Sequence, residues 1–157
     1  MEILRQQFLR HIGQTSPSPM LVEVARAEGV CFFTPEGKRY YDIIAGVSVS
    51  NVGHGNPAVT EAVCRQARDY MHVMVYGELV ERPQVRYAAR IAEYLPVPLD
   101  AVYFVNSGAE AVEGALKLAK RFTGRRRMVA CRNAYHGSTH GAMSVMAVSY
   151  THLTLPT

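Results

Sequence analysis

Residues 104–120 read FVNSGAEAVEGALKLAK, and this stretch decides the fold of the chain. Apolar residues recur in it at the spacing of one helix face, which predicts a helix over about residues 109–122. The members of this face are Val112, Ala115, Leu116, Ala119 and Phe122. A short apolar run at residues 101–105 precedes the helix, and small residues join the two: Ser107, Gly108 and Ala109. The stretch therefore predicts a strand, a tight turn and a helix.

A second apolar run at residues 128–131 follows Gly124, which is a typical helix stop. Strand, helix and strand form a βαβ unit, and such units build a parallel sheet with right-handed crossovers. Residues 56–148 are therefore predicted to begin a large α/β domain. We expect residues 1–55 to form a small N-terminal segment with a helix and an antiparallel meander. Residues 149–157 break this pattern and are expected to be a foreign tail.

Three further elements have clear local signals. The first residues up to Gly13 read as a short helix. Asn56 followed by Pro57 predicts a helix start, with a capping side chain and a proline at the first helical position. Another helix is expected to begin at Pro83 and to stop before Pro96. The meander is expected to turn at Glu28–Gly29 and at residues 35–37.

The small residues before the long helix suit an anion. A helix N-terminus carries unpaired N–H groups and a partial positive charge, and it binds phosphate where the ligand can approach closely. Gly108 has no side chain to block the approach, and Ser107 adds a hydroxyl group. A plain serine cap without a ligand explains the same residues, and the spacing alone favours neither reading. The stretch lacks the glycine patterns of P-loops and of dinucleotide-binding turns.

A second glycine-rich turn, NAYHGSTHGAMS at residues 133–144, follows the next predicted strand. In a parallel sheet, ligands bind at the carboxyl ends of the strands, so both turns are expected at one sheet edge. Tyr135 is then suited to stack on a flat ring whose phosphate lies at Gly108. Two such turns, one strand apart, point to a phosphorylated ligand more strongly than either turn alone.

Composition excludes several classes of protein. The 157 residues are 48% hydrophobic and 19% charged, with a net charge of +4, as in an ordinary globular protein. The arginines at 125–127 read as a solvated turn rather than as a nucleic-acid interface. No run of 18 apolar residues is present, so no membrane partner is expected.

The three cysteines lack metal-site spacing and read as reduced thiols of a cytoplasmic protein. His136 and His140 lack the HExxH pattern, so a metal-dependent hydrolase is a weak alternative and no metal is expected.

Three segments together resemble the class III pyridoxal-phosphate aminotransferases, the ornithine, acetylornithine and GABA type. Residues 103–125 are similar to the family's phosphate-binding segment, and residues 133–144 to the segment whose aromatic ring stacks on the cofactor. Residues 37–59, GKRYYDIIAGVSVSNVGHGNPAV, resemble its N-terminal Gly–Tyr–Asp and Gly-His run. The resemblance covers roughly residues 20–147, and the three motifs fall in the family's order.

This resemblance implies fold type I, pyridoxal 5′-phosphate as cofactor, and transfer of an amino group from an amino acid or amine to a 2-oxo acid. It also implies a homodimer with active sites at the subunit interface. The residues that match the family's cofactor site are Ser107, Gly108, Ala109, Tyr135, His136 and Gly137. The residues that match regions near the substrate entrance or the dimer interface are Val47, Ser48 and Tyr76.

Two departures from the family pattern limit the prediction. Ser138 and Thr139 follow the His-Gly pair, where acetylornithine-type members tend to carry an arginine, so the substrates stay open. The family's Schiff-base lysine and the aspartate at the pyridine nitrogen lie far downstream. The lysines of this chain are Lys38, Lys117 and Lys120. Lys117 lies roughly 12 Å along the helix from its phosphate end, at ~1.5 Å per residue.

None of these lysines is a credible partner for the cofactor. The chain is therefore expected to be an N-terminal aminotransferase fragment that supplies no catalytic residue and is inactive alone. A non-catalytic α/β module that binds a phosphorylated ligand or a partner protein is the alternative from another class.

Overall fold

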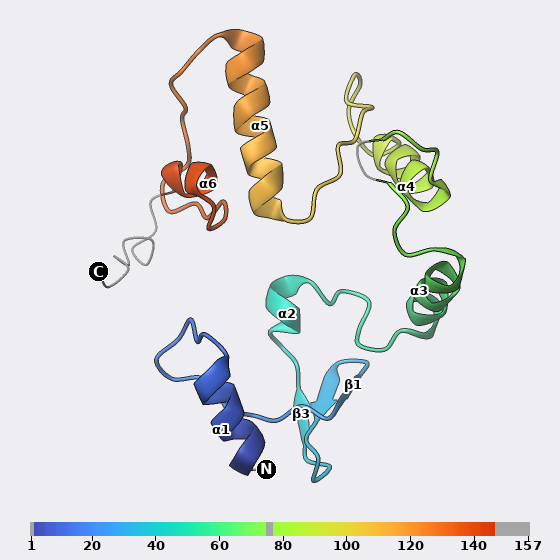
Figure 1. The fold of residues 1–157 in the computed structure, drawn as a ribbon, viewed down its shortest axis with the longest axis vertical. Coiled ribbons are helices and arrows are strands. Elements are labelled where there is room, and N and C mark those ends of the chain that lie inside the picture. The colour runs from blue at the N-terminus through green and yellow to red at the C-terminus, as the bar shows by residue number, and fades with distance from the viewer. Residues whose placement is uncertain (1, 75–76, 147–157) are drawn as a thin grey trace. The chain divides into compact units, whose positions relative to one another are not determined.

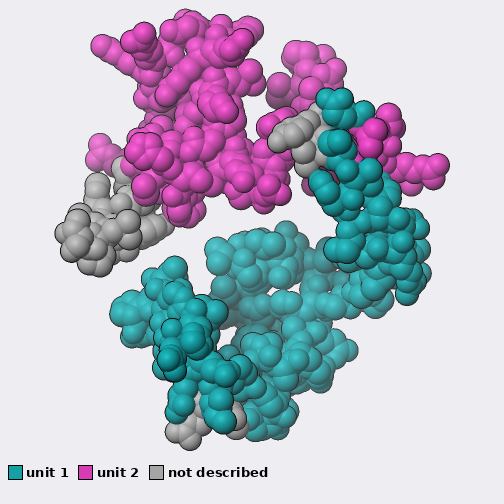
Figure 2. Space-filling model, viewed as in Figure 1, with its two compact units in different colours: residues 1–78 teal, residues 79–157 magenta. Residues whose placement is uncertain are grey.

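The structure is a computed structural model that describes residues 2–74 and 77–146. The chain divides into two compact units, Met1–Glu78 and Leu79–Thr157, which Figure 2 distinguishes by colour. The domain divisions expected after residues 55 and 148 stay predictions. The expected foreign tail, residues 149–157, lies outside the described residues.

The first unit contains the meander that the sequence predicts. Helix α1 (Glu2–His11) precedes three antiparallel strands in the order β1 (Arg26–Glu28), β2 (Cys31–Phe33) and β3 (Arg39–Tyr41). Ala27 pairs with Phe32, and Phe32 pairs with Tyr40 on the other side. The Phe32 and Tyr40 rings stack with centroids 5.3 Å apart. Such cross-strand aromatic pairs fix the register of a short sheet.

Helices α2 (Ala45–Ser48) and α3 (Pro57–Asp69) complete the first unit (Figure 1). The Asn56 side chain accepts hydrogen bonds from the N–H groups of Ala58 and Val59, at 3.1 and 3.4 Å. The predicted start of α3 is therefore confirmed, with the asparagine as the cap that satisfies its first donors.

The second unit contains α4 (Arg82–Ala92), α5 (Gly108–Thr123) and α6 (His140–Ser144). Gly124 follows α5 in the left-handed conformation, with φ 68°, which confirms the predicted stop. The short helix α6 lies against α5 (Figure 1). Tyr87 of α4 packs against Phe104, with ring centroids 5.9 Å apart, so α4 contacts the segment that leads into α5.

The two strands predicted at residues 101–105 and 128–131 are wrong for the described part of the chain. Neither segment forms a strand there, and the sheet of the structure is the antiparallel meander alone. An apolar run becomes a parallel strand only when neighbouring strands accept its hydrogen bonds. The described residues supply no such neighbour for either run, so both runs are connections without regular secondary structure.

The predicted apolar face of α5 also needs correction at its C-terminal end. Ala115 is exposed, and Phe122 is 88% exposed. The half-buried positions of α5 are Ala109, Val112, Glu113, Gly114, Leu116 and Ala119. Val112, Leu116 and Ala119 of the predicted face are thus half-buried, and Ala109 and Glu113 join them where the segment with α6 packs on α5. Within the described ranges, the buried residues are Cys31, Gly137 and Ala142, so two of the three lie in the segment that contacts α5.

Candidate functional site

The N-terminus of α5 is capped and open at the same time. Ser107 has extended backbone angles, and its Oγ accepts a hydrogen bond from the N–H of Glu110 at 3.2 Å. The Glu110 carboxylate turns back and accepts a hydrogen bond from the N–H of Asn106 at 2.7 Å. A Cβ atom at Gly108 would meet nothing within 4 Å, so the space beside this residue is free of protein. The cap is therefore present, and it leaves room for an anion beside the N–H groups of Gly108 and Ala109.

The second glycine-rich turn lies directly on this helix end. A Cβ atom at Gly137 would sit 2.5 Å from the Cβ and 2.8 Å from the Cα of Ala109. Gly137 has φ +121°, a conformation that favours glycine, and it is buried. Only glycine permits this approach of two backbones. The structure thus brings together two of the segments that the sequence selected as a site.

Tyr135 lies two residues before this contact. Its ring is 57% exposed, and its hydroxyl lies 3.1 Å from Oγ of Ser138. The backbone N–H of His136 donates to Sδ of Met146 at 2.9 Å. The exposed ring is suited to stack on a planar ligand, while the contact with Ser138 restrains its phenol end.

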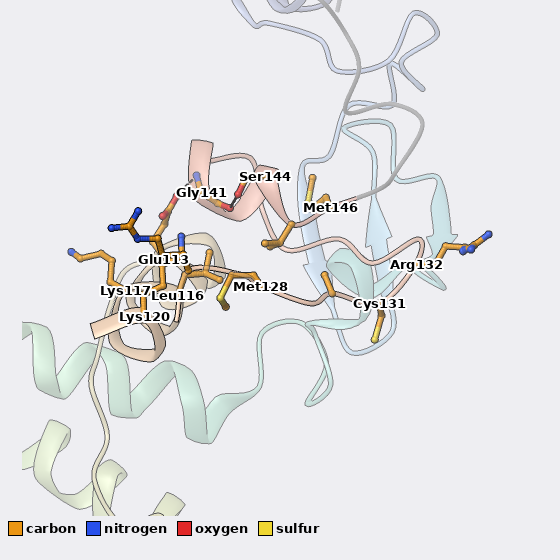
Figure 3. A pocket seen from close by; sticks show the side chains of 13 residues that line it. Glu113, Leu116, Lys117, Lys120, Met128, Cys131, Arg132, Gly141, Ser144 and Met146 are labelled. Atoms are coloured by element: carbon orange, nitrogen blue, oxygen red, sulfur yellow. Dashed lines mark hydrogen bonds between the residues drawn. The ribbon is translucent and has the colours of Figure 1, made fainter. Parts of the chain in front are cut away.

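Glu113, which the sequence did not single out, joins α5 to α6. Its Oε1 accepts hydrogen bonds from the N–H groups of Gly141 at 2.7 Å and Ala142 at 3.2 Å, as Figure 3 shows for Gly141. A hydrogen bond from the Thr139 side chain, followed by those from the two N–H groups, lowers the pKa of the Glu113 carboxyl. The signal for this residue was a carboxylate four positions after Ala109, on the same face of the helix.

An open pocket lies beside this junction (Figure 3). Its lining includes Glu113, Lys117, Lys120, Arg126, Gly141 and Ser144. None of the six residues predicted to hold the cofactor contributes to that lining. The pocket therefore adjoins the second turn, through Gly141 and Ser144, and does not include Gly108.

In the first unit, Asp42 makes a comparable set of contacts. Its Oδ2 lies 2.7 Å from Nε2 of His54, and its Oδ1 accepts the N–H of Ala45 at 2.8 Å. The hydrogen bond with His54, followed by the one from Ala45, lowers the pKa of Asp42. No local sequence signal pairs these two side chains, because they are 12 positions apart.

The predicted substrate residues lie in an exposed, strained turn. Ala45, Gly46, Val47 and Ser48 have φ of 49°, 60°, 62° and 62°, the left-handed region that costs energy for residues with a side chain. Val47 is 81% exposed. Tyr76, the third predicted residue, lies outside the described residues.

Lysines and histidines were the other candidates for chemistry, as partners of a cofactor and as metal ligands. The ammonium of Lys38 lies 4.8 Å from the centroid of the Tyr40 ring, and its interaction with Tyr40 raises the pKa of this lysine. His136 lies in a turn and His140 begins α6, so the two do not share a helix face. Over residues 2–74 and 77–146, no group of three or more His, Cys, Asp or Glu side chains is arranged to hold a metal ion. None of the helices within these ranges is long and apolar enough to cross a bilayer.

Comparison with known proteins gives the family. The model of the aminotransferase class-III family matches residues 12–156. Acetylornithine aminotransferase of Methanopyrus kandleri is 41% identical over 136 residues, which cover 85% of this chain and 33% of that protein. The chain spans about a third of the length of the curated relatives that it matches.

Solved structures agree with the sequence relatives. An (S)-enantioselective omega-transaminase from Thermomicrobium roseum has a TM-score of 0.86 at 31% identity, over 99% of this chain and 37% of that one. An adenosylmethionine-8-amino-7-oxononanoate aminotransferase from Methanocaldococcus jannaschii has a TM-score of 0.86 at 26% identity, over 96% and 37% of the two chains. This chain therefore belongs to the class III aminotransferases and contains part of their fold-type-I architecture.

Proposed function

We propose that this chain supplies the cofactor cradle of an aminotransferase that uses pyridoxal 5′-phosphate. The contact between Gly137 and Ala109 carries the proposal, because it brings the turn with Tyr135 onto the N-terminus of α5. A phosphorylated, planar ligand needs both features at once, namely N–H donors for its phosphate and an aromatic face for its ring.

The residues of this chain fit such a cofactor. The N–H groups of Gly108 and Ala109 donate to the phosphate, and the open space at Gly108 admits it. The Ser107 hydroxyl accepts from Glu110 and keeps its own proton to donate. Tyr135 stacks on the pyridine ring, while His136 and Gly137 hold the turn. When bound, pyridoxal phosphate acts as an electron sink for amino-group transfer.

The activity of the whole protein follows as a proposal from the family. An amino acid or amine donates the amino group, and a 2-oxo acid accepts it. A homodimer with shared active sites is part of the same proposal, and so are a cytoplasmic location and a role for Val47, Ser48 and Tyr76 near the substrate. The relatives named above include acetylornithine aminotransferases. Ser138 and Thr139 leave the donor of this protein open.

We further propose that none of the three lysines of this chain bonds covalently to the cofactor. Lys117 and Lys120 lie in the C-terminal half of α5, and the ammonium of Lys38 lies over the Tyr40 ring in the meander. Residues 1–157 alone are then inactive. Incubation with pyridoxal phosphate, reduction with borohydride and mass spectrometry should find no stoichiometric phosphopyridoxyl-lysine. A single, fully labelled lysine together with turnover would contradict this.

The cradle itself is tested by Gly108→Val with Gly114→Val as its matched control. Both glycines lie in α5, and neither would bring a Cβ within 4 Å of another group. The helix-propensity change is similar and below ~1 kcal/mol at each site. Only the first variant places a branched side chain where the phosphate sits. We expect Gly108→Val to weaken pyridoxal phosphate binding by about tenfold or more, ~1.4 kcal/mol, in an absorbance titration.

Gly114→Val should bind the cofactor as the natural sequence does. Equal affinity in all three proteins would refute the cradle. Binding of inorganic phosphate without any preference for the pyridoxal form would favour the non-catalytic phosphate-ligand module instead.

A further inference from the structure

Two contacts, one helical turn apart, fix the Tyr135 turn and α6 to α5. Gly137 lies on Ala109, and Gly141 lies on Glu113. The spacing is four residues on both sides, so both contacts fall on one face of α5. The first contact consists of backbone shape alone. The second adds directional hydrogen bonds, from the N–H groups of Gly141 and Ala142 to Glu113 Oε1.

Glu113 replaces the cap that α6 lacks. Thr139 occupies the N-cap position of α6 but makes no side-chain hydrogen bond to the helix. Its side chain instead lowers the pKa of the Glu113 carboxyl. The first donors of a helix need acceptors, and here a carboxylate from a different helix provides them. The start of α6 is therefore tied to α5 rather than to its own preceding loop.

The fit at this second contact is tight. A Cβ atom at Gly141 would lie 2.1 Å from Oε2 and 2.7 Å from Cδ of Glu113. Ala142 beside it is fully buried. The carboxylate and the glycine therefore occupy one position relative to each other, and a shift of α6 along α5 breaks both hydrogen bonds.

We propose that Glu113 is a positioning residue that holds the Tyr135 turn at a fixed height above the N-terminus of α5. This inference rests on the proposed function, because that height matters only where one ligand contacts both Tyr135 and Gly108. Gly137 keeps the turn close to α5. Glu113 stops it from sliding or rotating about that single backbone contact.

Charge and position predict opposite effects of removing this carboxylate. Glu113 is negative and lies little more than one turn from the phosphate end of α5, so its charge alone opposes a phosphate there. If only charge mattered, Glu113→Ala and Glu113→Gln would bind every phosphorylated ligand more tightly. If Glu113 positions Tyr135, both variants lose affinity for a ligand that carries a ring.

The first measurement uses the cofactor-free protein and hydrogen exchange followed by mass spectrometry. In Glu113→Ala, the amides of residues 140–146 should exchange about tenfold faster, because an acceptor for two N–H groups is gone. Glu113→Gln keeps an oxygen acceptor without the charge, so the same amides should exchange only about threefold faster than in the natural protein. Glu61→Gln is the matched control, since Glu61 lies on α3 and pairs with exposed Arg65.

The second measurement compares two probes, pyridoxal phosphate and inorganic phosphate. We expect Kd for pyridoxal phosphate to rise about tenfold in Glu113→Ala and about threefold in Glu113→Gln. Kd for inorganic phosphate should stay unchanged or fall. The visible circular dichroism of the bound cofactor should also decrease, because it reports the ring on Tyr135. Tighter binding of both probes would overturn the inference in favour of charge alone.

Gly141→Ala provides a variant that keeps Glu113. Its methyl group displaces the end of a flexible side chain rather than backbone, so the protein should fold. It should weaken pyridoxal phosphate binding in the natural background and add nothing in the Glu113→Ala background. Additive effects would overturn the inference, and so would unchanged exchange in Glu113→Ala. If the natural protein binds inorganic phosphate but not pyridoxal phosphate, the proposed function itself fails, and the inference fails with it.

Discussion

Two carboxylates of this chain, Asp42 in the first unit and Glu113 in the second, each hold the start of a short helical turn. Asp42 accepts the N–H of Ala45, three residues ahead, and shares its other oxygen with His54. Glu113 accepts the N–H of Gly141, 28 residues ahead. Asp42 is thus part of a local structure with a titratable partner. Glu113 has mainly backbone partners, and its contacts form only when two distant segments dock.

Both carboxylates lie beside a close glycine contact. A Cβ at Gly53 would sit 3.1 Å from the carbonyl oxygen of Gly29, and the Gly29 and His54 backbones exchange two hydrogen bonds. At Gly137 the corresponding distance, to Ala109, is 2.5 Å. The first contact, at 3.1 Å, is within reach of a small adjustment, whereas the second, at 2.5 Å from Cβ and 2.8 Å from Cα of Ala109, requires the two segments to separate. The contact of the Tyr135 turn with α5 therefore tolerates an added side chain less well than the contact between Gly53 and Gly29.

The largest expected effect comes from Gly137→Ala. The substitution forces a side chain onto the Ala109 backbone and keeps a φ that disfavours L-residues. We expect the free energy of unfolding to fall by about 2–4 kcal/mol, from strain and overpacking together. Urea denaturation measures this, with Gly13→Ala as control because a Cβ there meets nothing within 4 Å. Equal stability of the two variants would contradict the claim that the close contact of Gly137 with Ala109 requires glycine.

Asn56→Ala gives the scale of a purely local cap. Its side chain caps α3 from within its own segment. Loss of this cap should lower the free energy of unfolding by about 1 kcal/mol, measured in the same denaturant series. A larger loss than that of Gly137→Ala would contradict the proposal that the long-range contact contributes more to the free energy of unfolding than the local cap does.

His54→Gln separates the two carboxylates by their response to pH. Both have a pKa below the usual range, so each contributes stability that is present above its unfolded pKa and lost as pH falls through its folded pKa. The hydrogen bond with His54 is the largest cause of the lowered pKa of Asp42, and His54 is not among the causes of the lowered pKa of Glu113. We expect the substitution to raise the pKa of Asp42 and leave that of Glu113, in a carboxyl-carbon NMR titration. A shift of both, or of neither, would contradict the separation.

The smallest effect is expected for Glu61→Gln. Its carboxylate lies 2.7 Å from Arg65, and both side chains are mostly exposed. Such surface pairs contribute about 0.5 kcal/mol or less. Thermal melting should therefore leave this variant close to the natural protein, and a large loss would mean that surface charge matters more here than the docked glycines do.

Local signals in the sequence were enough for the elements that cap or turn within a few residues. Asn56–Pro57 starts α3, Gly124 ends α5, and the breaks at Gly29 and Gly37 separate the strands. The strands at residues 101–105 and 128–131 were wrong because apolar runs carry no information on which segment will pair with them. The prediction for Phe122, which is exposed, was wrong for a similar reason, since the spacing of apolar residues does not show which side of a helix a distant segment will cover.

The candidate site was predictable in part. Two glycine-rich turns after apolar runs suggested one ligand, and the structure brings Gly137 onto Ala109. The hydrogen bonds that hold this arrangement were not predictable, because Glu113 and Gly141 are 28 residues apart and nothing in their two segments shows that they pair. The pairing of Asp42 with His54 was not predictable either, because these residues are 12 positions apart.

The most direct test of the central claim is an NMR titration of the protein with pyridoxal phosphate. The claim is that the N-terminus of α5 and the ring of Tyr135 hold the same molecule. We predict amide shifts at Gly108 and Ala109 with both inorganic phosphate and pyridoxal phosphate, and cross-relaxation between the Tyr135 ring and the pyridine protons with the latter alone. Binding that leaves the Gly108 amide unmoved, or that places the pyridine ring away from Tyr135, would contradict the account.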